Sequence, residues 1–260
     1  MAPSWLKEYK DFGIEVECLT ASPLWLSANA IRYSHDNHHL SDSEHQYDAV
    51  DGMYEGTICG QKDKALIQRV GCKLKHESVL EMIDFTFSIH GISRALLLEL
   101  SRHRIASLTV QSSRYVLHKL LRDEEPFAYA YVDDDGDPVI STAEGAFERA
   151  KKYIMFTGDS YIDGCNVMTL ERLRKGVVKG ISNDKLKYLM SECFRTKLQY
   201  KINARSLRNL LVLRTSKDAL WEFRLLCRAL LDAMPKEYLY LFEDVIKFEG
   251  NEKTEKVEGV

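Results

Sequence analysis

The sequence lacks the features that mark several large classes of protein. No apolar run among its 260 residues approaches the length of a membrane span, and residues 1–10 lack the apolar core of a secretory signal. The six cysteines are scattered without paired C-x-x-C spacing, which is typical of reduced thiols and not of disulfides or a zinc site. We therefore expect a cytoplasmic protein that does not associate with membranes.

An excess of charge of one sign is also absent. There are 36 Lys and Arg residues against 39 Asp and Glu residues, so the formal net charge is −3. This balance argues against a general nucleic-acid-binding or membrane-surface protein. With 45% hydrophobic and 29% charged residues, and without internal repeats, the chain is typical of a globular protein with a sizeable core. Any basic site must therefore be local.

One such basic site lies at residues 101–115, a window that contains no carboxylate. Crowded arginines repel one another unless an acid or a bound anion neutralises them. Arg side chains match phosphate oxygens, and hydroxyls and amides can complete the site. The window thus predicts phosphate binding, with a solvated basic helix end as the alternative. Its basic and polar side chains include Arg102, His103, Arg104, Gln111, Ser112, Ser113 and Arg114.

Periodicity predicts a mixture of strands and helices. Residues 83–92 alternate apolar and polar side chains and form the clearest strand, after which Ser93 can cap a helix. The expected strands are 13–23 and 83–92, and the expected helices are 26–33, 63–76, 93–102, 141–156, 168–174, 183–194, 203–214 and 221–231.

Two polar segments are expected to be loops without bound metal. Residues 34–44 carry His35, His38 and His39, with His45 just beyond, but their spacing fits no established ligand pattern. Residues 133–138 resemble a calcium loop only superficially, because the closing Glu is missing.

A second polar constellation lies at residues 203–214. In one helix, Asn203, Leu207, Leu210 and Arg214 would share a face. A partly buried Arg needs an anionic or strongly polar partner, and Asp218 is the local alternative to a ligand.

Two runs resemble the signatures of the flavin-dependent thymidylate synthases. The first is Arg-His-Arg at 102–104, followed after seven residues by Ser112, and the second is Asn-Ala-Arg-Ser at 203–206, followed by Asn209 and a Leu-Arg pair. His76 and Ser78 are similar to a His-x-Ser pair of the same family. The resemblance covers roughly residues 14–243.

The resemblance implies both a fold and a reaction. The implied fold is α+β, a single domain over residues 1–245 with a central antiparallel sheet flanked by helices, and residues 246–260 would be a polar, disordered tail. The implied reaction converts dUMP to dTMP with FAD as cofactor, 5,10-methylenetetrahydrofolate as carbon donor and NADPH as reductant. The family forms homotetramers whose active sites combine several subunits.

The resemblance also assigns roles to residues. Arg214 would activate the uracil ring, and no cysteine lies in either signature, so no protein thiol is expected as nucleophile. The flavin would be contacted by His76, Ser78, Arg102, His103, Arg104, Asn203, Arg205 and Asn209. The nucleotide would be contacted by Glu99, Arg102, Gln111, Ser112, Ser113, Arg114, Lys187 and Arg214.

Three positions depart from the common family pattern. Many members have Gln at Glu99, Glu at Val110 and Arg at Lys187. Glu99 precedes Arg102 by three residues and His103 by four, so it can pair with either. The departures leave open one-carbon transfer to another pyrimidine nucleotide. A phosphate- or nucleic-acid-binding protein without flavin, or an Arg-rich oligomer interface, remains the alternative outside enzymes.

Overall fold

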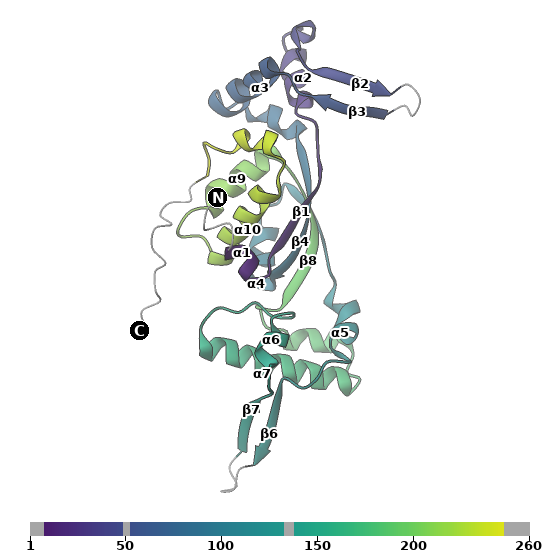
Figure 1. Ribbon diagram of the computed structural model, residues 1–260, viewed down its shortest axis with the longest axis vertical. Helices are drawn as coiled ribbons and strands as arrows, with labels where there is room; N and C mark the ends of the chain where they lie inside the picture. The colour runs from purple at the N-terminus through teal and green to yellow at the C-terminus, as the bar shows by residue number, and fades with distance from the viewer. Residues whose placement is uncertain (1–7, 49–52, 133–137, 247–260) are drawn as a thin grey trace.

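A four-stranded antiparallel sheet forms the centre of the molecule (Figure 1). The computed structural model describes residues 8–48, 53–132 and 138–246. The expected antiparallel sheet with flanking helices is confirmed. In spatial order its strands are β1 (Glu15–Ala21), β4 (Asp84–Ser93), β8 (Arg195–Asn203) and β5 (Ala106–Val110).

The strand β4 is central because it pairs with both β1 and β8. Its alternating sequence places Phe85, Phe87 and Ile89 on one face, where each is fully buried. The adjacent strand β8 follows the same rule, with Leu198, Tyr200 and Ile202 buried. Alternation of period two therefore gives the sheet one apolar and one polar face.

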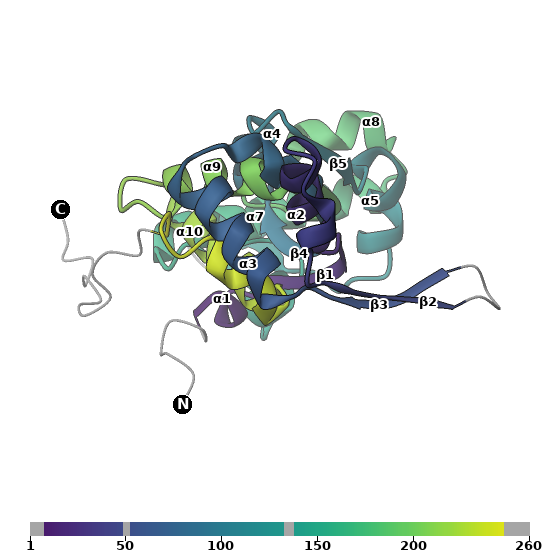
Figure 2. The same ribbon diagram turned by 90° about the horizontal axis from the view of Figure 1, so that it is seen from above.

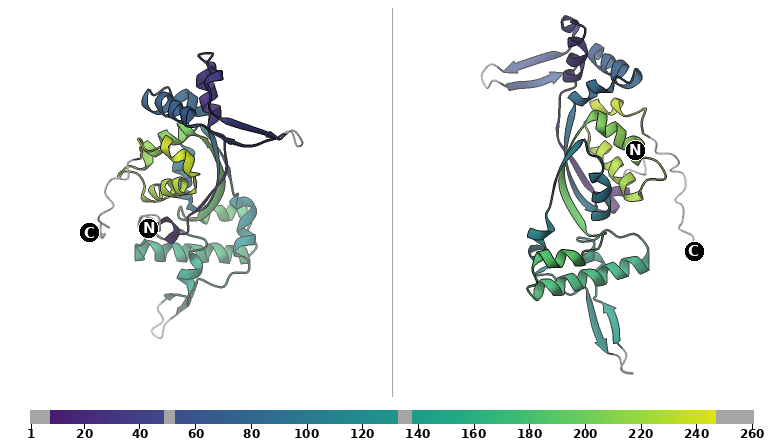
Figure 3. Two further views of the ribbon diagram at one scale, coloured as in Figure 1. Left: turned by 45° about the horizontal axis from the view of Figure 1, so that its top comes forward. Right: turned by 180° about the vertical axis from the view of Figure 1, so that it is seen from behind.

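Helices cover only the apolar face of the sheet (Figures 1 and 3). They are α4 (Arg94–Ser101), α9 (Ala204–Arg214), α10 (Trp221–Ala233) and the short α1 (Glu8–Asp11). Two of them begin directly at strand ends. Ser93 accepts a hydrogen bond from the backbone N–H of Leu96, and Asn203 accepts one from the N–H of Ser206, so each is the N-cap of the helix that follows its strand.

The chain from β1 to β4 forms a separate layer at one end of the sheet (Figures 1 and 2). The expected helix at 63–76 is α-helical only in its first part and continues as a π-helical turn, where the N–H of Leu74 bonds to the carbonyl of Arg69. The elements are α2 (Trp25–Tyr33), η2 (His38–Leu40), β2 (Glu44–Asp48), β3 (Met53–Ile58), α3 (Gln61–Ile67), the π-helical η3 (Gln68–Lys73) and η4 (Glu77–Met82).

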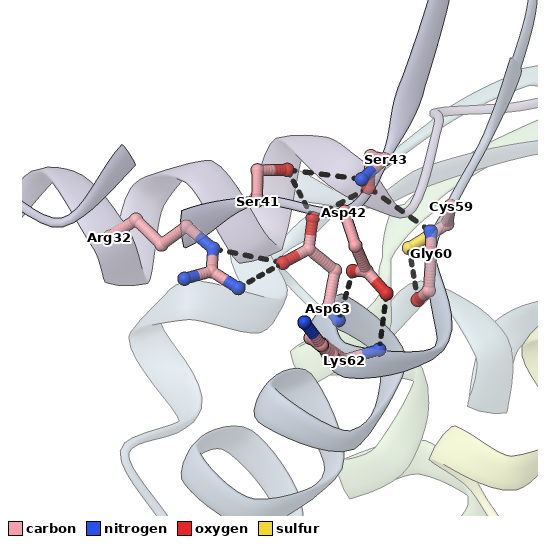
Figure 4. Close-up of polar contacts among 8 residues, drawn as sticks. All are labelled: Arg32, Ser41, Asp42, Ser43, Cys59, Gly60, Lys62 and Asp63. Carbon is pink, nitrogen blue, oxygen red and sulfur yellow. Dashed lines mark hydrogen bonds and ion pairs between the residues drawn. The ribbon is translucent and has the colours of Figure 1, made fainter. Parts of the chain in front are cut away.

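A buried ion pair joins α2 to α3 (Figure 4). Arg32 donates from Nε and Nη2 to Oδ1 of Asp63 at 2.9 and 2.5 Å. Ser41 and Ser43 donate to Oδ2 of the same carboxylate, each at 2.6 Å. Burial opposes ionisation, but these hydrogen bonds outweigh it and lower the pKa of Asp63. The loop that follows α2 is thereby fixed against α3.

The start of α3 also contacts this loop. Asp42 accepts hydrogen bonds from the backbone N–H groups of Lys62 and Asp63 at 2.8 and 3.0 Å. This close approach requires glycine at position 60, because a Cβ there would lie 2.2 Å from Cγ of Asp42. A carboxylate at a helix N-terminus also suits the helix dipole.

The chain from β5 to β8 forms a second module at the opposite end of the sheet (Figure 1). It has its own apolar core, which includes Leu117, Phe127, Leu170 and Phe194. The elements are α5 (Ser113–Leu121), β6 (Ala128–Val132), β7 (Pro138–Thr142), α6 (Ala146–Ala150), α7 (Ser160–Val178), α8 (Asn183–Leu186) and η5 (Lys187–Leu189), and the 3-10 helix η6 (Lys236–Leu241) follows α10 in the main body.

Three expected helices in this module differ from the structure. The helix expected at 141–156 is wrong at both ends: Ser141 and Thr142 end β7, Gly145 has a left-handed φ of 65°, and α6 ends at Ala150. The helix expected at 168–174 is part of the longer α7. The helix expected at 183–194 ends at Leu189, and Phe194 instead forms a β-bridge with Ile154. Residues 133–137 and 247–260 lie outside the described residues.

We predict that Asp63→Ala lowers the free energy of unfolding by about 3–5 kcal/mol, because it leaves the buried guanidinium of Arg32 without its carboxylate. The side chain of Asp63 is fully buried and that of Arg32 is 8% exposed. Urea denaturation of the purified protein measures the change.

The matched control is Asp123→Ala, since Asp123 is exposed in the turn that follows α5. That variant should stay within about 0.5 kcal/mol of the wild type. Equal unfolding midpoints for the two variants would contradict a structural role for the Arg32–Asp63 pair.

Candidate active site

Arg214, the last residue of α9, is the centre of a cluster from three helices. Its Nη2 lies 3.0 Å from Oε2 of Glu99 on α4, and its Nε donates to Nε2 of His103 at 3.1 Å. The guanidinium carbon lies 4.7 Å from the ring centroid of Phe223 on α10. The side chain of Arg214 is 18% exposed, so one side of it faces solvent. As expected for a shared face, Leu207 and Leu210 of the same helix are fully buried.

Glu99 supplies the negative charge that the 101–115 window lacks. Besides Arg214, it accepts from Arg102, whose Nη1 lies 3.2 Å from Oε1. Burial raises the pKa of Glu99, but the hydrogen bonds and charges of the two arginines outweigh this and lower it. The local alternative, a pair between Arg214 and Asp218, is not among the ion pairs of the described residues, where Arg214 pairs with Glu99. The sequence did offer a pair between Glu99 and Arg102, but not the contact with Arg214.

His103 is held in its neutral form. Because Nε2 accepts a hydrogen bond from Arg214, the proton of the ring lies on Nδ1. Burial, and then the positive charge of Arg214, hold the pKa of His103 below its usual value of 6.5. The charge of Glu99 acts in the opposite direction.

A second group of expected site residues lies where α5 meets α8. Nε of Arg114 lies 2.6 Å from Oδ1 of Asp184, and the side-chain amide of Asn183 donates to the carbonyl of Arg114 at 2.8 Å. Arg114, and more weakly Lys187, lower the pKa of Asp184. Arg114 and Lys187 are both exposed, so an anion can reach them from solvent.

The polar residues before Arg114 lie at the start of α5. Ser112 precedes Ser113, the first residue of that helix, and both are half-buried. Gln111 continues the pairing of β5 with β8 through its N–H, which donates to the carbonyl of Lys197 at 2.9 Å. Its side chain lines a separate cavity of about 190 Å³ that Arg195 and Lys152 also line.

A third group lines a cavity of about 750 Å³ between α2, η3 and η4. His76 and Ser78 lie at its edge and are exposed. Val79 and Met82 contribute apolar surface. A pocket of this size and lining falls within the range of about 300–1,000 Å³ that is usual for cofactors and other small molecules.

The remaining expected flavin contacts lie at the start and on the exposed face of α9, and at Arg104 after α4. Asn203 already uses its side-chain oxygen to cap the helix, which leaves its amide N–H groups for a ligand. Nη1 of Arg205 lies 2.5 Å from Oε1 of Glu81. Asn209 and Arg104 are exposed. One chain therefore brings together Glu99, Arg102, His103 and Arg214, while the Arg114 group and the His76 group lie in the modules at opposite ends of the sheet (Figure 1).

Two residues at the Arg214 cluster were missed by sequence reasoning. Phe223 and Cys227 both lie on α10, whose apolar sequence indicated only a core helix. Cys227 is fully buried, and burial raises the pKa of its thiol even though the charge of Arg214 acts to lower it. A thiol in this state is a poor nucleophile, so the cysteine beside Arg214 is suited to packing and not to covalent catalysis.

Comparison with known proteins identifies the family. The family model Thy1, thymidylate synthase complementing protein, matches residues 19–238. The flavin-dependent thymidylate synthase of Wolinella succinogenes is 48% identical over 183 residues, which are 70% of this chain and 82% of that protein. The chain belongs to the flavin-dependent thymidylate synthase family. The family expected from the two signatures is thus confirmed.

Other members of the family match over nearly their whole length. The flavin-dependent thymidylate synthase of Helicobacter pylori strain J99 is 42% identical over 235 residues, which are 90% of this chain and 100% of that protein. The crystal structure of thymidylate synthase X from Helicobacter pylori, obtained with FAD and dUMP, matches with a TM-score of 0.75 and 41% identity, covering 90% of this chain and 99% of that one.

The part of the chain that the structure describes contains neither a metal-binding cluster nor a helix able to span a membrane. No group of three or more His, Cys, Asp or Glu side chains in this part of the chain is arranged to hold a metal ion. None of its helices combines the length and the apolar character that crossing a membrane needs.

We predict opposite shifts of the His103 pKa in two variants. Glu99→Gln should lower it further, because the negative charge that offsets the arginines is lost, whereas Arg214→Gln should raise it. NMR titration of the imidazole C–H resonances measures both shifts. Because the folded-state pKa is depressed, the stability contributed by neutral His103 is present above a pH of about 6.5 and is lost as the pH falls through the folded pKa.

The control is Lys217→Gln, which removes one positive charge at an exposed position outside the cluster. It should shift the His103 pKa less than Arg214→Gln does. Shifts of the same sign in Glu99→Gln and Arg214→Gln would show that the charges of this cluster do not set the protonation of His103.

Proposed function

We propose that this chain is a FAD-dependent thymidylate synthase that converts dUMP to dTMP. The carbon donor is 5,10-methylenetetrahydrofolate and the reductant is NADPH. The observation that carries the proposal is the match to a Helicobacter pylori structure with FAD and dUMP over 90% of this chain. The Arg214 cluster supports it independently, because it presents a partly exposed, oriented cation of the kind that polarises a carbonyl group.

The cavity beside η4 fits a flavin. It combines apolar side chains, which suit a ring system, with the polar groups of His76 and Ser78 and with the basic side chain of Arg69. Bound FAD would supply the hydride for the reductive methylation. The residues of this chain would bind and orient the cofactor. They are His76 and Ser78 at the cavity, His103 and Arg104 just after α4, Asn203 at the end of β8, and Arg205 and Asn209 on α9.

The basic groups outside the cavity suit a nucleotide. Arg114 and Lys187 are exposed cations that would bind the phosphate of dUMP, in place of the present contact between Arg114 and Asp184. Ser112 and Ser113 would add hydroxyl or backbone donors. Arg214 would donate to the pyrimidine and favour negative charge on its carbonyl oxygens, while Glu99 and His103 hold the guanidinium in place.

A complete site requires more than one copy of the chain. The Arg114 group and the His76 group belong to opposite ends of the molecule, so one subunit does not enclose a substrate between them (Figure 1). The polar face of the sheet offers a surface for association, since Lys197, Gln199 and Lys201 of β8 are exposed there. We therefore assign the protein to homotetramers with shared active sites, acting in the cytoplasm.

The first test is the absorbance spectrum of the purified protein, followed by titration with dUMP and product analysis. We expect flavin bands that shift when dUMP binds, and dTMP formation only when methylenetetrahydrofolate and NADPH are both present. Absence of flavin after incubation with FAD would refute the proposal. If the enzyme methylates a different pyrimidine nucleotide and not dUMP, it is instead a one-carbon transferase that acts on that nucleotide.

We predict that Arg214→Ala keeps FAD binding but lowers kcat for dTMP formation by roughly 10²–10³-fold, which is the usual cost of removing one oriented charge-stabilising donor. Steady-state kinetics with product quantification measures kcat.

Lys217→Ala is the control, because it removes an exposed cation three residues beyond the cluster and should leave kcat unchanged. Full activity of Arg214→Ala would remove Arg214 from the reaction.

A further inference from the structure

The side chain beneath the Arg214 cluster comes from α10, outside both sequence signatures. Phe223 is fully buried in the third position of that helix. Its ring lies under the guanidinium of Arg214, with 4.7 Å between the guanidinium carbon and the ring centroid. The same ring meets that of His103 nearly perpendicularly, with centroids 5.7 Å apart and an interplanar angle of 80°. One aromatic side chain thus contacts both functional groups.

These contacts restrict how Arg214 can lie. A cation within about 6 Å of an aromatic centroid is attracted by the negative charge density of the ring face. The guanidinium is planar, and two of its edges are already used, Nε by His103 and Nη2 by Glu99. With these two edge contacts alone, the guanidinium plane could still turn out toward solvent. The Phe223 ring beneath the guanidinium opposes that motion.

The ring itself is firmly placed. Phe223 follows Glu222, whose buried carboxylate accepts hydrogen bonds from the backbone N–H of Ser93 at 2.6 Å and from the Ser93 hydroxyl. Ser93 is the N-cap of α4, the helix that carries Glu99. The first turn of α10 therefore holds the start of α4 through Glu222. Through Phe223 it also contacts His103, just beyond the end of α4, and Arg214.

We propose that Phe223 is a positioning residue for the reaction, which holds the guanidinium of Arg214 in its working orientation through the face of its ring. This inference rests on the proposed function. It differs from a role in the core alone, because an aliphatic side chain would fill the same space but would not attract the cation.

The test uses fluorinated phenylalanines, which keep the shape of the ring and withdraw charge from its face. We would place 4-fluoro- and 3,4,5-trifluorophenylalanine at position 223 of the full-length protein. We expect kcat to fall stepwise, by roughly 3- to 30-fold at the trifluoro residue. The Tm and the FAD content should stay unchanged. The proton exchange rate of the Arg214 Nε–H, measured by NMR, should rise in the same order.

The matched control is Phe87, which is fully buried in the same core and whose ring stacks with that of Phe85. The same fluorinated residues there should leave both kcat and the Arg214 exchange rate at their wild-type values. Equal effects at positions 87 and 223 would overturn the inference.

A double-mutant cycle supplies a second test. Phe223→Leu should lower kcat in the wild-type background and cause no further loss in Arg214→Ala, because the ring acts through that guanidinium. Fluorinated variants with wild-type kcat in an active enzyme would overturn this inference and leave the proposed function intact. A wild type that forms no dTMP under any condition would overturn both.

Discussion

The pairing of β4 with both of its neighbours is the constraint on which the rest of the structure depends. It places the apolar faces of β1, β4 and β8 in one layer, against which α4, α9 and α10 pack. It also sets where the two functional helices begin. β4 ends at Ser93 opposite Arg195, and β8 ends at Asn203 opposite Asp84, so α4 and α9 start at opposite ends of the sheet. The last turn of α4 and the residues just after it then meet the last turn of α9, at Glu99, His103 and Arg214.

The electrostatics of the cluster follow from having one acid among several cations. Glu99 is shared by Arg102 and Arg214, and neither arginine is fully neutralised by it. Burial, and then repulsion by the charge of Arg214, lower the pKa of His103 and keep the ring neutral. The cluster therefore keeps a surplus of positive charge that is directed outward, which is the arrangement an anionic nucleotide requires. Burial of the neighbouring Cys227 prevents its thiol from ionising and competing for that charge.

The sequence predicted those parts of the fold in which local pattern and tertiary packing agree. Residues 83–92, the cap at Ser93 and the helix after Asn203 were all predicted, because each combines a clear periodicity with a specific cap. The helix expected at 141–156 was wrong because strand pairing with β6 takes up its first residues. The contact between Glu99 and Arg214 joins residues from different helices, which no local pattern encodes. The role of Phe223 was not predicted for another reason, because an aromatic residue on an apolar helix is most often only part of a core.

The π-helical turn at Gln68–Lys73 affects the cavity that His76 and Ser78 line. A π turn contains one more residue than the α turn it replaces, and here it ends the helix: the N–H of His76 bonds to the carbonyl of Val70, and Lys75 before it has a φ of 58°. The segment that follows carries His76 and Ser78. The direction in which these two residues face therefore depends on the number of residues before them more than on their chemical nature. Loss of a single residue from this turn would redirect both side chains at once while leaving every contacting residue type in place.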